Sequence, residues 1–489
     1  MIVMKFGGTS VGNGERYREV ARLLGSYLEK QPVAVVSAMA GSTDWLLNTA
    51  RALADGGRNP SASSHNAEKC VTDFHKRNFE VIAAAIHNPE IRQQVEVVVE
   101  GLIQLLLRLL TGVELLGELS PRSLDAVAAF GEKISVQVLA GALQDLGFKA
   151  QPISAEELIL TDRTFQAARP QMAITTNRCR SRLLPLVESG VIPVVTGFIG
   201  ATDDGITTTL GRDGTDFSAS IIGASLDADE IWIWKEVDGV MTADPRLVPN
   251  ARSLRRISYA EAGELTHFGA KVIHPLTVMP AIEKGIPIFI KNTFNPSFPG
   301  TRIDHAHEAT DGVVKAVTSA RNLALITVLG GGVLTVPGIA ARTFARMADQ
   351  NVNVYMISHA SSGHDLCLVV EKKVIPQVIP ALRKEFEREL EIKEIDAIEA
   401  DPQIVTIAVV GAGMRGAPGV AGRLFSALGR KSINIMVIAQ GSSELNISLI
   451  VSADDEQEAL VTIHEEFLSL TGLGKTLSRS MNATKLGHN

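Results

Sequence analysis

The sequence predicts an α/β protein: about 305 residues built on a mainly parallel sheet, followed by two copies of a smaller α/β module. Two observations predict this architecture. Short apolar runs suited to buried strands alternate with helical stretches from residue 1 to about 305. Beyond them the chain matches itself without a gap, since Gly330 corresponds to Gly411 and Phe386 to Phe467 at the same offset of 81 residues.

The elements of the first region follow in order. An apolar start at Met1–Met4 predicts a strand, and a helix is expected at Glu15–Glu29. Residues 65–120 predict a helix-rich insertion. Four further buried strands are expected at Pro32–Val36, Val191–Val195, Glu230–Trp234 and Ile286–Ile290, with helices at Ser123–Leu146 and Arg178–Glu188.

Each copy of the repeat predicts the order strand, helix, strand, strand, helix, with a Pro-Gly pair at 337–338 or 418–419 before the first helix. Modules so short usually pack on each other, and their glycine-rich turns leave room for a small zwitterion held by backbone groups. The alternative is a pair of structural modules that only form a dimer interface.

Composition limits the classes of partner. The chain has 489 residues, which suggests roughly three domains. Its formal charge of −7 gives no general attraction to nucleic acid or to an anionic membrane. Any anionic ligand must therefore be held by local basic groups.

Targeting and metal signals are weak. The three cysteines lie far apart and the histidines show no ligand spacing, so neither a disulfide framework nor a protein-held metal is expected. Lys5 interrupts the apolar start, which argues against a signal peptide. The apolar stretch Val97–Leu110 contains charged residues and predicts a buried helix instead of a membrane span. We expect a cytoplasmic protein.

The opening motif Lys5-Phe6-Gly7-Gly8-Thr9-Ser10 lies at a predicted strand-to-helix turn. Glycines let backbone N–H groups approach a phosphate, the helix start favours negative charge, and the lysine adds a full positive charge. Such a turn alone is common in α/β proteins, so the motif gains weight only from its companions.

Three further polar segments also follow predicted strands, so all four are expected at one edge of the sheet, where such folds bind ligands. These segments are residues 36–43, residues 197–216 and residues 234–275. Together they suit phosphoryl transfer, which needs positioning and positive charge more than covalent chemistry. Lys5 and Lys271 are the candidate cations, Asp216 could orient them or hold an ammonium group, and Arg212 could grip a carboxylate. Each residue alone is better explained as part of a surface ion pair or a solvated turn.

Two other motifs are weaker. Residues 411–416 fit G-x-G-x-x-G, but the matching repeat has Thr335 at the last glycine, and Asn434 stands where a ribose-binding acid is expected. We interpret them as a loop of the repeat. Residues 474–476 resemble the end of a P-loop, but Ser469 replaces the leading glycine.

These motifs resemble aspartate kinases of the amino acid kinase superfamily, and the repeat resembles their paired ACT domains. The resemblance rests on Lys5–Ser10, on Thr207–Asp216, on Phe130-Gly131-Glu132, on Asp244-Pro245-Arg246, on Phe268–Pro275 and on Gln440–Ser448. It implies a three-layer kinase domain at 1–305 and ferredoxin-like βαββαβ modules at 320–398 and 402–475. The resemblance also allows the second module to be inserted into the first, with 476–489 as a tail.

The resemblance implies an activity. The γ-phosphate of ATP, with Mg²⁺ held mainly by the phosphates, would pass to the β-carboxylate of L-aspartate, the first step toward lysine, threonine and methionine. Lys5, Asp216 and Lys271 would be catalytic. The aspartate site would comprise Ser37, Thr43, Glu132, Phe198 and Arg212. The ATP site would comprise Lys5, Gly7, Gly8, Ser10, Lys235, Asp244, Arg246 and Lys271.

Regulation is implied as well. Lysine or threonine is the candidate effector, and a homodimer or homotetramer would form through the ACT domains. Effector contacts would involve Val336, Gly338, Ile339, His359, Gln440 and Asn446. Since the sequence stops at Asn489, no homoserine dehydrogenase domain is expected.

Departures and rivals remain. Asp213, Glu236 and Met241 differ from the common pattern and bear on nucleotide contacts. One rival is a superfamily kinase for another acid, carbamate or a nucleotide. The other is an amino acid sensor without catalysis.

Overall fold

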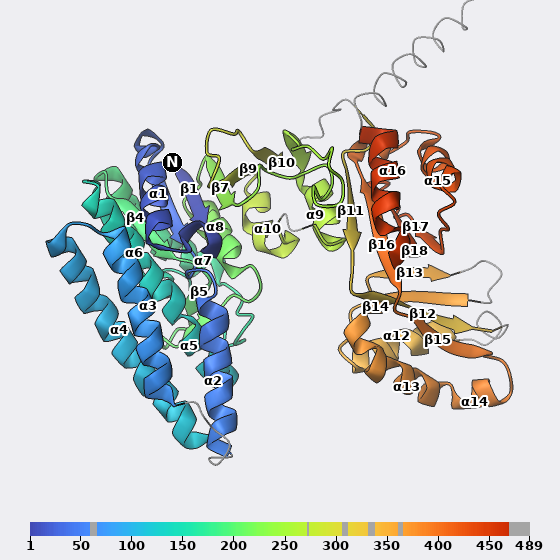
Figure 1. Ribbon diagram of the computed structural model, residues 1–489, viewed down its shortest axis with the longest axis horizontal. Helices are drawn as coiled ribbons and strands as arrows, with labels where there is room; N and C mark the ends of the chain where they lie inside the picture. Colours follow the sequence, from blue (N-terminus) through green and yellow to red (C-terminus); the bar gives the residue numbers. More distant parts are fainter. Residues whose placement is uncertain (59–65, 271–272, 306–311, 331–337, 360–364, 469–489) are drawn as a thin grey trace, which may run out of the picture. The chain divides into compact units, whose positions relative to one another are not determined.

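A computed structural model describes residues 1–58, 66–270, 273–305, 312–330, 338–359 and 365–468 (Figure 1). The chain forms two compact units. The first unit comprises Met1–Val240, Arg255–Tyr259 and Ile273–Ala306, and the second comprises Met241–Leu254, Ala260–Val272 and His307–Asn489.

The first unit is built on an eight-stranded sheet with the order β3-β4-β2-β1-β7-β9-β10-β8. All neighbouring strands are parallel except β9 and β10. The predicted parallel α/β class is therefore confirmed. The strands are β1 (Ile2–Phe6), β2 (Pro32–Val36), β3 (Ala150–Ile153), β4 (Ile192–Thr196), β7 (Glu230–Lys235), β8 (Arg256–Ser258), β9 (Ile288–Asn292) and β10 (Thr301–Asp304).

Helices cover both faces of this sheet. Side chains alternate along a strand, so Met4 packs into a cluster with α1 (Gly14–Gly25) and α6 (Phe130–Asp145). On the other face, Gly223 of α8 (Gly214–Ser225) lies against Val3 and Ile231, where a Cβ atom would come within 2.6 Å of Ile231. Helices α7 (Met172–Glu188) and α10 (Pro275–Glu283) pack against α8.

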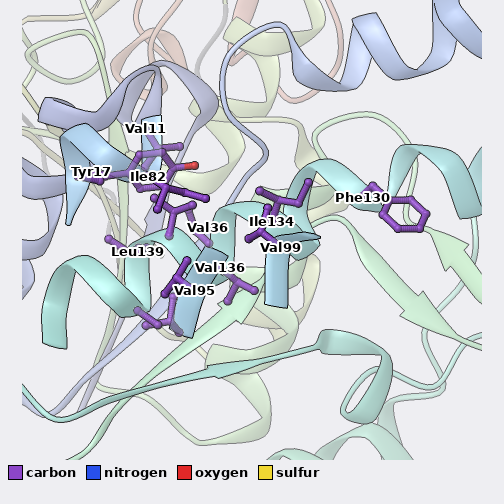
Figure 2. Close-up of a cluster of buried hydrophobic side chains, with 14 of the residues drawn as sticks. Val11, Tyr17, Val36, Ile82, Val95, Val99, Phe130, Ile134, Val136 and Leu139 are labelled. Atoms are coloured by element: carbon purple, nitrogen blue, oxygen red, sulfur yellow. The ribbon is translucent and has the colours of Figure 1, made fainter. Parts of the chain in front are cut away.

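The predicted insertion consists of α3 (Ala67–Ala85) and α4 (Pro89–Leu116), which pack with α2 (Ser42–Arg58) and extend away from the sheet (Figure 1). Figure 2 shows Ile82 of α3 with Val95 and Val99 of α4 among the apolar side chains of this cluster. The helix predicted as buried is only half buried, because α4 packs with one face and leaves Val97 and Leu105 exposed.

The helix predicted at Ser123–Leu146 is two helices, α5 (Pro121–Ala128) and α6. Residues 121–145 are the described segment that is long and apolar enough to cross a membrane, but 83% of its apolar window is buried inside the protein. Such burial is what a core helix shows.

The second unit contains the two modules, each with the predicted order of elements. The first module comprises β12 (Leu323–Leu329), α12 (Ile339–Asp349), β13 (Met356–His359), β14 (Asp365–Glu371), α13 (Ile375–Glu385), α14 (Glu387–Glu391) and β15 (Ala397–Asp401). The second comprises β16 (Ile404–Val410), α15 (Val420–Arg430), β17 (Val437–Ala439), β18 (Asn446–Ser452) and α16 (Glu456–Leu468). The glycine of each Pro-Gly pair lies directly before the first helix of its module, as predicted. Gly338 and Gly419 are the N-cap residues, with φ of +94° and +83°.

The repeat conserves packing as well as order. Arg342 lies 4.7 Å from the centroid of the Phe386 ring, and Arg423 lies 4.6 Å from that of Phe467. Arg342 also pairs with Glu385 and Glu389, on either side of Phe386 in the chain, and Arg423 pairs with Glu466, next to Phe467, at 3.1 Å. The offset of 81 residues thus superposes two equivalent cation–π contacts.

The nesting of the modules differs from the expectation that the second is inserted into the first. The two sheets have the orders β13-β14-β12-β15 and β11-β16-β18-β17. Strand β11 (Ala316–Ala320) precedes the first module in the chain but pairs with β16 of the second. It takes the place that β15 takes beside β12, so the first module is inserted into the second.

Candidate active site

The carboxyl ends of β1, β2, β4 and β7 lie side by side in the first unit, and polar segments follow them. A pocket of about 310 Å³ opens there. Every residue predicted for an aspartate site lines it. The lining comprises Lys5, Gly7, Gly8, Ser37, Thr43, Glu132, Phe198, Gly211, Arg212, Asp213, Gly214, Thr215 and Asp216.

The glycine turn after β1 has a steric cause. A Cβ atom on Gly8 would lie 2.9 Å from the carbonyl oxygen of Ala38, so no side chain fits between these loops. Gly7 caps a short 3-10 helix at Gly8–Val11. Ser10 does not line the pocket: its hydroxyl is buried and lies 2.7 Å from that of Thr293.

Two lysines converge on one buried carboxylate. Lys5 Nζ lies 2.6 Å from Asp216 Oδ1, and Lys235 Nζ lies 3.7 Å from Asp216 Oδ2. Burial alone would raise the pKa of Asp216, but the charges of Lys5 and Lys235 outweigh it and hold that pKa below its usual value. Burial lowers the pKa of Lys235, which Asp216 opposes. The centre holds two positive charges against one negative charge, so it favours an anion.

The turn at residues 211–213, the arginine turn, has positive φ angles on both sides of Arg212. Gly211 and Asp213 flank Arg212 with φ of +79° and +54°. Asp213 stands in the left-handed region, which aspartate tolerates better than most residues other than glycine and asparagine. The Arg212 side chain is 89% exposed and lies 3.9 Å from Asp213. Phe198, at φ +67°, forms another wall of the pocket.

Glu132 is the second buried carboxylate of the pocket. It lies in the first turn of α6, is 2% exposed, and accepts a hydrogen bond from the backbone N–H of Ala38 at 3.2 Å. Its Oε2 has no hydrogen-bond partner among the described residues. Burial raises the pKa of Glu132 to about 8. A buried oxygen without a partner, facing a pocket, suits a ligand ammonium group.

Three further predicted nucleotide residues are not among the described residues of the first unit. Asp244 and Arg246 belong to the second unit, where Arg246 Nη2 lies 2.6 Å from Asp244 Oδ2. Lys271 lies outside the described residues. Among the described residues no cluster of three histidine, cysteine or carboxylate side chains could hold a metal ion.

The predicted effector residues are spread over both modules. Val336 lies outside the described residues. Ile339 is buried, His359 ends β13 and Gln440 follows β17. The Asn446 side chain donates to Glu264. A separate cavity of about 440 Å³ lies at the end of α12, lined by Phe344, Met347, Ala348, Asn351, Val352, Asn353 and Val354.

One buried carboxylate near the pocket escaped the sequence analysis. Asp125 of α5 is 1% exposed and accepts hydrogen bonds from Thr209 and Gln166. The available signal was weak: a single acid stands in the apolar run Leu124–Val127, where burial of a charge requires partners.

Family models match both units. Residues 1–292 match the amino acid kinase family, and residues 326–386 and 407–467 each match an ACT domain. The two ACT matches confirm the repeat. An amino acid kinase domain joined to two ACT domains is the class of protein that these matches define.

Known proteins narrow this class. Aspartokinase 3 of Arabidopsis thaliana is 32% identical over 471 residues, which are 95% of this chain and 81% of that protein. The bifunctional aspartokinase/homoserine dehydrogenase 2 of the same plant is 36% identical over 96% of this chain but 51% of its own length. The chain therefore spans about half the length of several curated relatives.

Solved structures agree. Escherichia coli aspartokinase III, in complex with lysine and aspartate, has a TM-score of 0.78 at 26% identity, covering 96% of this chain and 100% of that one. The aspartate kinase of Clostridium acetobutylicum gives 0.78 at 25% identity, with the same coverage. The chain belongs to the aspartokinase family.

Proposed function

We propose that this protein transfers the γ-phosphate of Mg·ATP to the β-carboxylate of L-aspartate, giving 4-phospho-L-aspartate and ADP, the first step toward lysine, threonine and methionine. The observation that carries the proposal is the convergence of all five predicted aspartate-site residues on one pocket, together with the predicted catalytic residues Lys5 and Asp216. The E. coli relative was solved with aspartate and ADP, which agrees with this chemistry.

The pocket offers a partner for each charged group of aspartate. The exposed guanidinium of Arg212 can take the α-carboxylate with two parallel hydrogen bonds. The unpartnered oxygen of Glu132, together with Asp216, suits the ammonium group. The hydroxyls of Ser37 and Thr43 would then lie toward the reacting end with Lys5.

The reaction needs no protein base, because an ionised β-carboxylate is already a nucleophile. One of its oxygens forms a bond to the γ-phosphorus, the bond from phosphorus to the bridging oxygen breaks, and ADP leaves with the electron pair. Catalysis then rests on alignment and on lysine charge near the transferring group. The Lys5 side chain is 10% exposed and its ammonium group pairs with Asp216. The ammonium is therefore in position before the substrate binds.

Magnesium enters as part of the nucleotide substrate. We propose that the phosphates supply most of its ligands. Lys235 lies on the same carboxylate as Lys5 and is our proposed phosphate contact in the first unit. We retain Asp244, Arg246 and Lys271 as proposed nucleotide contacts on sequence grounds alone.

The test is phosphorylation of aspartate trapped as the hydroxamate. Wild type should form product only with ATP and Mg²⁺. Lys5→Ala should lower kcat by at least about a hundredfold, since a positioned charge is lost at the transferring group. Lys76→Ala, at an exposed lysine of α3, is the matched control and should retain full activity. Near-normal turnover by Lys5→Ala, or turnover of another acid, carbamate or a nucleotide in place of aspartate, would refute the proposal.

We also propose feedback control by lysine or threonine through the ACT modules, in a cytoplasmic homodimer or homotetramer. Exposed apolar side chains on the edge strands of both sheets support assembly there: Ile357 of β13 is 48% exposed and Ile438 of β17 is 44% exposed. Adding lysine or threonine to the hydroxamate assay tests this control, and one of them should lower the rate of product formation. We keep 305 as the proposed limit of the kinase domain.

A further inference from the structure

Asp125 links two segments of the chain, one at Gln166 and one at Thr209, by accepting hydrogen bonds from both. Its Oδ2 accepts the backbone N–H of Thr209 at 2.9 Å and its Oδ1 accepts the Thr209 hydroxyl at 2.8 Å. The backbone N–H of Gln166 is shared between both oxygens, at 3.2 and 3.0 Å. Burial raises the pKa of Asp125, while these three donors oppose the shift.

Thr209 is the last residue of β6 (Thr207–Thr209), and the next residues form the arginine turn. Leu210 donates its N–H to the carbonyl of Phe198, a wall of the pocket, at 2.9 Å. Gly211 then adopts φ +79°, and a Cβ atom there would lie 2.9 Å from the carbonyl oxygen of Gln166. Both segments that Asp125 holds therefore touch the turn that presents Arg212.

The side chain of Arg212 makes few contacts that would fix its position. Its side chain is exposed, with one carboxylate at 3.9 Å among its described neighbours. The orientation of its guanidinium thus depends on the backbone beneath it, and that backbone is tied to α5 by Asp125.

We propose that Asp125 is a positioning residue that sets the affinity for the substrate α-carboxylate by holding Thr209 and the arginine turn. This inference rests on the proposed function of the pocket. A carboxylate is needed because both oxygens accept: asparagine would turn its NH₂ group toward the N–H of Thr209 or of Gln166 and leave a donor facing a donor.

The test compares Asp125→Asn with Asp145→Asn. Asp145 is the control, because its carboxylate is only 5% exposed and also accepts a backbone N–H, that of Asn88 at 2.6 Å, but it ends α6 and holds neither residues 163–169 nor the arginine turn. Asp125→Asn should raise the KM for aspartate about tenfold to a hundredfold, with the KM for ATP changed less than about twofold. Asp145→Asn should leave both constants unchanged.

A double-mutant cycle asks whether Asp125 acts through Arg212. Once Arg212→Ala has removed the guanidinium, Asp125→Asn should add almost nothing to the KM for aspartate. Thr209→Val removes only the hydroxyl bond and should give a smaller effect in the same direction, so the inference stays testable if Asp125→Asn folds poorly.

Hydrogen exchange provides a readout that does not need turnover. Asp125→Asn should speed exchange in residues 207–213 and leave residues 37–43 unchanged. Additive effects with Arg212→Ala, equal rises in both KM values, or unchanged exchange in 207–213 would each overturn the positioning role. A wild type that does not phosphorylate aspartate would instead refute the proposed function, and the exchange experiment would still decide whether Asp125 holds the turn.

Discussion

At the scale of single residues, Glu132 combines burial with an unused hydrogen-bonding atom. Its pKa of about 8 arises from desolvation that the N–H of Ala38 only partly offsets. Near neutral pH the carboxyl therefore retains its proton until a cation arrives. Binding of the substrate ammonium would lower this pKa, since an opposite charge favours the ionised form.

This shift makes a prediction about stability. The pKa is raised from 4.5 to about 8, so the folded protein binds more protons than the unfolded chain between these values, and stability falls as pH rises through this window. Glu132→Gln removes the titration. The free energy of unfolding of wild type relative to Glu132→Gln should therefore drop by about 1.4 kcal/mol per pH unit from pH 4.5 to 8. Thermal melts across this range measure it, and a flat difference would contradict the raised pKa.

Most pocket residues could be predicted because each follows a buried strand within a few positions. Lys5 is the second-last residue of β1 and Lys235 is the last residue of β7, and parallel strands bring such ends together. Ser10 and Asp125 could not be predicted correctly. Their roles depend on Thr293 and Thr209, partners that lie 283 and 84 positions away and that no local pattern indicates.

At the scale of elements, α4 shows that an apolar stretch does not indicate which face of a helix is exposed. Its stretch Val97–Leu110 is mostly apolar, so the sequence predicts a buried helix. The structure buries Leu106 completely and leaves its neighbour Leu105 41% exposed. The difference comes from α2, α3 and α6, which cover one face of α4.

The two adjacent leucines make a matched pair. Leu106→Ala should cost about 2–5 kcal/mol, because it removes packing and leaves a cavity. Leu105→Ala should change stability by about 0.5 kcal/mol or less, as exposed substitutions do. Denaturant unfolding followed by the tryptophans, all of which lie in the first unit, measures both. Equal losses for the two variants would show that the exposed face of α4 is covered.

At the scale of the whole molecule, the nested modules join distant parts of the chain. Strand β11 lies directly before the first module, yet its hydrogen bonds run to β16 with the register Ala316↔Val410 to Ala320↔Thr406. The repeat itself was predictable from the offset. This pairing was not. At the same offset β11 matches β15, which pairs with β12, so the repeat shows that the two strands are equivalent but not which sheet each one completes.

Equivalent core leucines can test which module holds β11. Leu368 of β14 and Leu449 of β18 are both fully buried and occupy matching positions of the repeat. In hydrogen exchange of the full chain, Leu449→Ala should raise exchange in β11 together with β16 and β18. Leu368→Ala should raise exchange in β12 and β14 and spare β11. The reverse outcome for β11 would mean that it belongs to the first module.

The nesting also sets an order of events during synthesis. Strand β11 ends at Ala320, but its partner β16 begins only at Ile404. At a translation rate of roughly 5–20 residues per second, β11 leaves the ribosome several seconds before β16 exists. The intervening module is synthesised during that time, and β11 waits with its backbone donors and acceptors unpaired. That interval is when a chaperone, or the same strand of a neighbouring nascent chain, can capture it.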